Sequence, residues 1–182
     1  MVSAESTTNV SEDKPRVLIR SGHETYAVSP EKALALAHLL AKAKRYKAAL
    51  QVCQKVVSLD AKDPQAVILM ACCEAGLKDY EGCNKILRAM FSGNQEVLAE
   101  HLQAAFVYHT LGMNSDSAKE LVALTDEQPD LPMVWLLLGD HLSEMGKQEK
   151  AALCWRLAID RAGHRGAAAL AAERELESAR NC

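Results

Sequence analysis

Aromatic residues are scarce in this chain, with two Trp, four Tyr and two Phe making up 4% of its 182 residues. Excess positive charge is lacking as well, since 21 Lys and Arg stand against 24 Asp and Glu for a net charge of -3. A chain without a basic excess does not offer the broad positive surface that holds nucleic acid or anionic lipid. We therefore expect neither nucleic acid nor a membrane surface as a partner.

Long hydrophobic runs are also missing. The longest nearly apolar stretch, Ala66 to Gly76, contains Glu74 and falls short of the roughly 20 residues that a membrane-spanning helix needs. The first residues, MVSAESTTNVSED, carry acids and hydroxyls where a secretory signal carries basic residues and then an apolar segment. The sequence thus predicts a cytoplasmic protein that does not insert into a membrane.

The sequence shows none of the usual motifs of catalysis or metal binding. It has no HExxH, no Cys/His ligand run and no Gly-rich phosphate loop. The adjacent Cys72 and Cys73 point about 100° apart on a helix, which disfavours a disulfide between them. Asp140, His141 and Ser143 match a hydrolase triad in composition only, because they spread around one helix. We expect reduced thiols and a protein that is not an enzyme, with no catalytic residues, no cofactor and no metal.

What the sequence does contain is a period of 34 residues. Pro30, Pro64 and Pro132 share one register, and Leu98 occupies the remaining position. Small residues recur at the eighth and twentieth positions of every unit, as required where two helices cross closely: Ala37, Ala71, Ala105 and Gly139, then Ala49, Cys83, Ser117 and Ala151. Self-similarity at this spacing predicts stacked helix hairpins.

Start and stop signals divide the chain further. Ser29-Pro30 and Asp63-Pro64 are typical helix starts, with a capping side chain before a proline that needs no hydrogen bond. The all-α fold expected has helices over 30–43, 46–59, 64–77, 80–91, 95–111, 115–126, 132–145, 148–161 and 166–180. They make up four units, 30–63, 64–97, 98–131 and 132–163. Before them come a flexible arm over 1–15 and an extended strap or small hairpin over 16–29, and after them a capping helix over 164–182.

The fourth unit resembles the tetratricopeptide repeat family. The resemblance rests on a set of positions within residues 132–163: Trp135, Leu138, Gly139, Leu142, Gly146, Ala151, Trp155 and Ala158. It implies a right-handed superhelical solenoid of about four repeats with the terminal helix as a cap. It also implies work as a scaffold or adaptor in protein-protein interaction.

In that family, one stripe of each leading helix lines a concave groove that binds a peptide. The resemblance implies that the fifth and ninth positions of each unit form this groove here: Leu34, Ile68, Leu102 and Leu136, then His38, Cys72, Phe106 and Asp140. No Lys, Arg or Asn occurs among them to grip a terminal carboxylate, so an apolar segment is the expected ligand. Two alternatives stay open: the four aliphatic residues are ordinary core, or residues 17–28 occupy the groove.

Three functions follow from this arrangement. The first is an adaptor that binds an apolar peptide segment of a partner protein. The second is a secretion chaperone, similar to the class II chaperones of type III secretion, that shields a translocator. The third is an array that associates with itself, as a homodimer, through its own groove.

Overall fold

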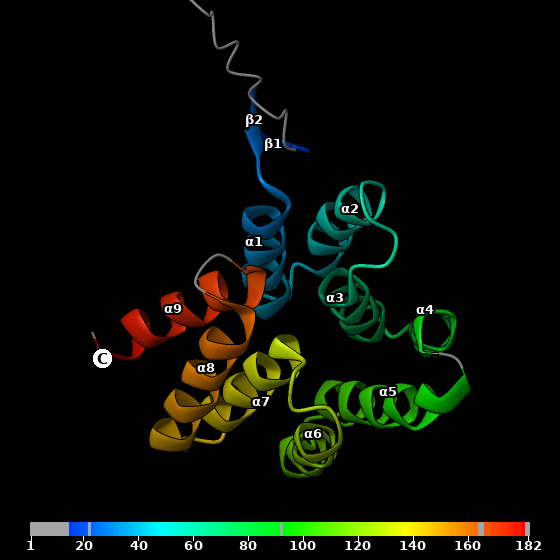
Figure 1. Cartoon of the computed structure of the whole chain (residues 1–182), viewed down its shortest axis with the longest axis vertical. Coiled ribbons are helices and arrows are strands. Elements are labelled where there is room, and N and C mark those ends of the chain that lie inside the picture. The colour runs from blue at the N-terminus through cyan, green and yellow to red at the C-terminus, as the bar shows by residue number, and fades with distance from the viewer. Residues whose placement is uncertain (1–14, 22, 92, 164–165, 181–182) are drawn as a thin grey trace, which may run out of the picture.

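The computed structural model describes residues 15–21, 23–91, 93–163 and 166–180, and their secondary structure is helical apart from one short hairpin (Figure 1). Residues 1–14 of the expected arm lie outside the described part. The strands are β1 (Val17–Ser21) and β2 (Glu24–Val28), and a 3-10 turn spans Gly93–Gln95. The helices are α1 (Pro30–Lys42), α2 (Tyr46–Val57), α3 (Pro64–Gly76), α4 (Tyr80–Met90), α5 (Glu96–Thr110), α6 (Asn114–Glu127), α7 (Pro132–Glu144), α8 (Gln148–Ala162) and α9 (Ala167–Arg180).

The helices begin where their capping residues allow. The Ser29 hydroxyl accepts a hydrogen bond from the amide of Lys32 at 3.4 Å, and the Asp63 carboxylate accepts one from the amide of Gln65 at 2.8 Å. Such side chains satisfy amide groups that the first helical turn leaves without a partner. The bounds of all nine helices in the described residues lie within two residues of the expected ranges.

The turns inside the four hairpins repeat at the level of the backbone. Lys44, Lys78, Gly112 and Gly146 each have positive φ, between 58° and 76°, and follow one another every 34 residues. In every turn the amide of that residue bonds the carbonyl three residues back, and the next amide bonds the carbonyl five back, at 2.8–3.0 Å. These bonds satisfy carbonyl groups at the helix end. The period in the sequence is therefore also a period in conformation.

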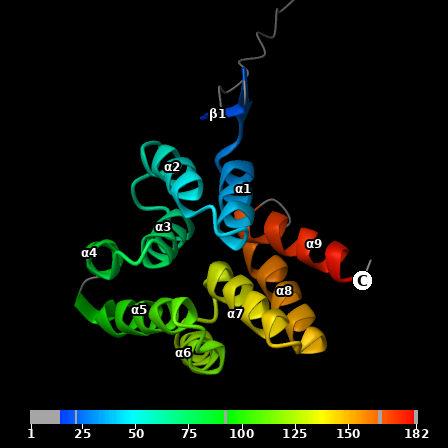
Figure 2. The same ribbon diagram turned by 180° about the vertical axis from the view of Figure 1, so that it is seen from behind.

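The hairpins are arranged in a ring. Figures 1 and 2 show α1, α3, α5 and α7 grouped around the middle of the molecule, with α2, α4 and α6 outside them. Helix α9 packs against α8 and α7 and also against α1, so the first and last helices are in contact. A capping helix is expected to turn its charged residues to solvent, but Glu175 of α9 is buried and accepts a hydrogen bond from Lys42 of α1.

The aliphatic residues assigned to the groove are core. Leu34, Ile68, Leu102 and Leu136 are at most 1% exposed. Their burial has a simple cause, because α1 contacts α3, and α3 contacts both α5 and α7. The helix face expected to line an open groove is instead the contact between neighbouring inner helices. For these four residues the groove prediction is wrong, and the ordinary-core alternative describes them.

Residues 17–28 form an antiparallel hairpin in which Val17 lies opposite Val28. The hairpin packs on the helices through Val17, which is buried against α1 and α2, whereas Leu18 and Tyr26 are about half exposed. The hairpin does not reach the middle of the ring. It borders a separate cavity of about 490 Å³ beside α1 and α9, whose apolar wall consists of Ile19, Val28, Leu36 and Leu170.

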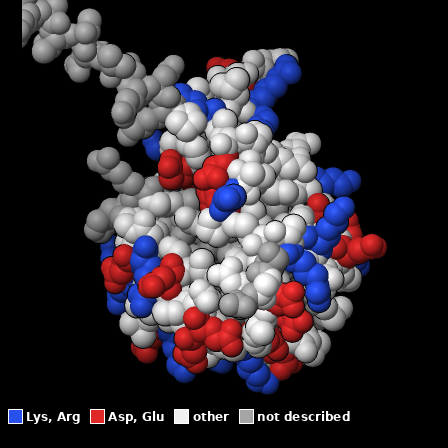
Figure 3. Space-filling view, turned by 45° about the vertical axis from the view of Figure 1, so that its right-hand side comes forward, with Lys and Arg blue, Asp and Glu red and all other residues white. Residues whose placement is uncertain are grey.

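Acidic and basic side chains are interspersed on one face of the molecule. Figure 3 shows them mixed on the face that it presents, with broad uncharged areas between them. This agrees with the small net charge of -3. In the described residues, no helix has both the length and the hydrophobicity that crossing a bilayer would require.

Candidate functional site: a polar cavity inside the ring

A cavity of about 410 Å³ lies between the C-terminal halves of the four inner helices. Each of these helices contributes at least one polar or ionisable side chain to its wall. Examples are His38 from α1, Cys72 from α3, His109 from α5 and Asp140 from α7. The first residues of α2 and α6, Tyr46 and Asn114, complete the wall. The ring therefore surrounds a space whose wall carries polar and ionisable side chains beside apolar ones such as Leu69 and Leu137.

The groove prediction agrees better with the structure at the ninth position of each unit than at the fifth. His38, Cys72 and Asp140 all line the cavity, although they come from three different units. Phe106, the ninth residue of the third unit, is 2% exposed and belongs to the core. Of the eight residues predicted for the groove, the structure thus brings three together around one cavity.

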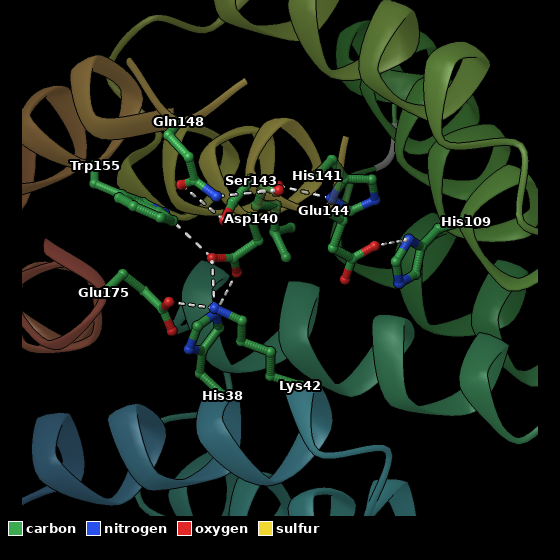
Figure 4. A network of polar contacts seen from close by, with 11 residues as sticks. His38, Lys42, His109, Asp140, His141, Ser143, Glu144, Gln148, Trp155 and Glu175 are labelled. Carbon is green, nitrogen blue, oxygen red and sulfur yellow. Dashed lines mark hydrogen bonds and ion pairs between the residues drawn. The ribbon is translucent and has the colours of Figure 1, made fainter. Parts of the chain in front are cut away.

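Asp140 is the centre of the first polar cluster (Figure 4). His38 donates a hydrogen bond from Nε2 to Asp140 Oδ2 at 2.6 Å, and Trp155 donates from Nε1 to Asp140 Oδ1 at 3.2 Å. Lys42 Nζ lies 3.6 Å from Asp140 Oδ1 and also pairs with Glu175. One buried carboxylate therefore ties α7 to α1 and α8, and through Lys42 to α9.

The charge of Asp140 is stabilised by its neighbours. Burial alone would raise the pKa of this carboxyl group, but the charge and hydrogen bond of His38, together with Lys42, outweigh burial and hold the pKa below its ordinary value. Asp140 is thus ionised at neutral pH. A buried carboxylate satisfied on both oxygens orients its partners, and here it fixes the His38 ring with Nδ1 as the nitrogen left over.

A second cluster lies on the opposite side of the cavity, where His141 and Glu144 of α7 approach His109 of α5 (Figure 4). His141 donates from Nδ1 to the carbonyl of Leu137 at 2.7 Å, so its Nε2 carries a lone pair. The His109 and His141 ring centres are 4.3 Å apart. Burial, and then the proximity of His109, lower the pKa of His141 to about 4. The His141 ring is therefore neutral at physiological pH.

Some buried polar atoms at this cavity lack partners. Nδ1 of His38, Nδ1 of His109 and Nε2 of His141 have no hydrogen-bond partner among the described residues. His38 is 2% and His141 4% exposed. Leaving a buried polar atom unpaired costs about 1–3 kcal/mol, so such atoms are uncommon in proteins. All three belong to side chains that line the one cavity.

The cavity wall lacks the features of a nucleophilic centre. Burial raises the pKa of the Cys72 thiol well above its ordinary value, which suppresses the thiolate. The Ser143 hydroxyl donates to Gln148 Oε1 at 3.2 Å rather than to a histidine. Within the ranges that the structure describes, no three His, Cys, Asp or Glu side chains are placed to hold a metal ion. The arrangement is suited to holding a polar group.

Several site residues escaped the groove prediction. Lys42, His109 and Glu144 lie one helical turn beyond the ninth position of their units, where an inward-facing stripe continues. Extending the stripe by one turn would have found them. Glu175 and the indole N–H of Trp155 carry no such signal, because they reach the site through α9 and α8.

The chain was compared with models of protein families and with curated proteins. Neither comparison gives a match.

Proposed function

We propose that this chain is a protein-binding module that holds a segment of a partner protein at the mouth of its central cavity. The observation that carries the proposal is the cavity, with its volume of about 410 Å³ and its unpartnered nitrogens on two buried histidines. Binding pockets in proteins typically measure roughly 300–1,000 Å³. A space at the lower end of that range admits a few side chains, so the rest of the partner would lie on the rim.

The scaffold in this proposal is a right-handed superhelical array of four hairpins of the tetratricopeptide type. It is supported by the identical hydrogen-bonded turns that recur every 34 residues. Such arrays commonly present extended binding surfaces, because each hairpin adds a similar set of side chains. The scaffold sets the kind of work, whereas the cavity decides the ligand.

Binding is favoured over catalysis by the state of the polar groups. His38 is hydrogen-bonded to Asp140 at 2.6 Å, and in the described residues no hydroxyl or thiol is bonded to its other ring nitrogen. Nucleophilic catalysis needs a base within hydrogen-bond reach of the nucleophile. The fixed His38 ring, whose second nitrogen has no partner, is therefore suited to hydrogen-bonding a bound group rather than to catalysis.

The rim suggests what surrounds the inserted group. Leu111 and Met113, in the turn between α5 and α6, are 61% and 43% exposed and flank the wall residues Gly112 and Asn114. A partner segment would therefore place a polar side chain in the cavity and apolar side chains against this turn. This replaces the purely apolar ligand expected from the sequence, since the aliphatic face is buried.

The test blocks the mouth of the cavity. Asn114→Trp places a large side chain at the wall, and Val97→Trp places the same side chain on an exposed part of α5 that does not line the cavity. Both variants should melt close to the wild type. In affinity capture from native extract, the Asn114 variant should lose a partner that wild type and the Val97 variant retain.

Capture that is equal for all three proteins would refute binding at the cavity. Self-association is separated from this by measuring mass in solution over a range of concentrations. If Asn114→Trp abolishes a concentration-dependent dimer and no other partner is lost, the module binds its own copy.

A further inference from the structure

The second cluster of the cavity sits where two helix ends meet. His109 is the penultimate residue of α5, Glu144 is the last residue of α7, and His141 precedes Glu144 by one turn. The C-terminal end of a helix carries partial negative charge from its aligned peptide dipoles. The Glu144 carboxylate adds a negative charge near these two ends, and together they favour a positively charged group at this point.

Each of the three side chains in this cluster has an atom that can accept a hydrogen bond. His141 Nε2 has a lone pair, because its Nδ1 hydrogen is committed to the Leu137 carbonyl. His109 Nδ1 lies 3.7 Å from Glu144 Oε2, which is too long for a hydrogen bond, and is buried without a partner. In the tautomer protonated at Nε2, His109 Nδ1 is likewise an acceptor. Glu144 Oε2 has only a long bond of 3.4 Å from Asn114.

We propose that this cluster, His109, His141 and Glu144, binds a primary ammonium group, the side chain of a lysine that the partner inserts into the cavity. The inference rests on the proposed function and names the group recognised. An ammonium carries three N–H donors and no acceptor. The cluster offers three acceptors: the two imidazole nitrogens and the carboxylate. Because Nδ1 of His109 and Nε2 of His141 are buried, this binding requires the His109 side chain, which is a quarter exposed, to rotate as the ammonium enters.

The rest of the cavity is compatible with this ligand. Lys42 is already neutralised by Asp140 and Glu175. Lys44 and Lys78 lie exposed at the rim, where their long side chains reach solvent. There they favour acidic residues on either side of the inserted lysine. Tyr46, also in the wall, offers an aromatic face of the kind that ammonium groups approach.

The experiment uses the full chain and two peptides. The first probe is the acetylated and amidated tripeptide glutamate-lysine-glutamate, and the second is the same peptide with its lysine ε-amine acetylated. Binding is followed by nuclear magnetic resonance through the ring signals of His109 and His141. The free-lysine peptide should shift both rings saturably, and the acetylated peptide should not. This comparison depends on no variant and therefore on no folding control.

A variant then tests the carboxylate. Glu144 is largely accessible, so Glu144→Gln keeps its shape and should fold normally. This substitution should weaken binding of the free-lysine peptide roughly tenfold, the loss of affinity expected for one charge-assisted hydrogen bond. Glu120→Gln is the matched control, because Glu120 also pairs with a histidine, His101 at 2.6 Å, but does not line the cavity. It should leave the affinity unchanged.

Three results would overturn the proposal: equal binding of both peptides, unchanged affinity in Glu144→Gln, or ring shifts caused by Zn²⁺ but not by the free-lysine peptide. None of these three results bears on the proposed function as a protein-binding module. If Asn114→Trp still abolishes capture of a partner but the free-lysine peptide does not bind, the proposed protein-binding function stands and only the proposed lysine ligand is wrong. If capture does not depend on the mouth of the cavity, the proposed function fails as well.

Discussion

Replacement of Asp140 by alanine should be the most damaging change to the ring. The carboxylate accepts bonds from His38 Nε2 and Trp155 Nε1 and lies near Lys42. Without it, an indole N–H and an imidazole N–H are left buried with no acceptor, and Lys42 keeps only Glu175. The helices that these residues join are α7, α8, α1 and α9, so the loss falls on the closure of the ring.

The size of the effect follows from these bonds. A hydrogen bond to a charged group contributes about 1.5–3 kcal/mol, and a neutral donor left unsatisfied costs about 1–3 kcal/mol. These two figures describe the same loss from two sides and are not added, and removing one member of a buried ion pair costs about 3–5 kcal/mol in total. For a chain of this length, this corresponds to a fall in melting temperature on the order of 10 °C.

The assay is equilibrium unfolding in urea, followed by far-ultraviolet circular dichroism. Asp130→Ala is the control, because Asp130 is an exposed carboxylate in the loop before α7 and should change the free energy of unfolding by no more than about 0.5 kcal/mol. A double-mutant cycle adds His38→Ala, and the coupling between Asp140 and His38 should exceed about 1 kcal/mol. A loss below about 1 kcal/mol for Asp140→Ala, or additive effects in the cycle, would refute the role assigned to this carboxylate.

Three further predictions concern acid, packing and thiols. Because folding lowers the pKa of Asp140, the stabilisation from its charge is complete above the unfolded pKa of about 4 and is lost as pH falls through the folded pKa. The difference in unfolding free energy between wild type and Asp140→Asn should therefore disappear in that acid range. A difference that persists there would contradict this prediction. Gly139→Ala should destabilise by about 1–3 kcal/mol in the same urea assay, because a Cβ at this position would lie 2.5 Å from Trp155 Cδ1; an unchanged midpoint would show that the indole moves freely. Burial raises the pKa of Cys53 and of Cys83 to about 12, so alkylation of these two thiols, mapped by mass spectrometry, should be slow in the folded chain and fast in urea; fast reaction of the native protein would contradict their burial.

The sequence predicts the local structure well because the signals for it are local. A capping residue followed by a proline fixes where α1 and α3 begin, and both caps bond the first turn. Small residues at the eighth position are explained by close contacts such as that between Gly139 and Trp155. The turn at Lys44 and Lys78 is less expected, because these two residues take a left-handed conformation that the third and fourth units give to glycine.

The nature of the site could not be predicted to the same degree. Leucine at a fifth position satisfies a groove and a core equally well, and the choice depends on how tightly successive hairpins wind. That winding is the sum of small rotations between hairpins, which no single residue encodes. The bond between Lys42 and Glu175 joins residues 133 positions apart and exists only because α9 returns to α1.

The contact between α9 and α1 fixes how many hairpins this protein can have. An open stack tolerates the gain or loss of one unit, because each unit touches only its neighbours. Here an added hairpin would carry α9 past α1, and a deleted one would stop it short, so either change would separate Lys42 from Glu175 and His38 from Asp140. Insertions and deletions are therefore better tolerated within the loops than as whole units, and evolution of this chain by duplication of a single hairpin would be blocked.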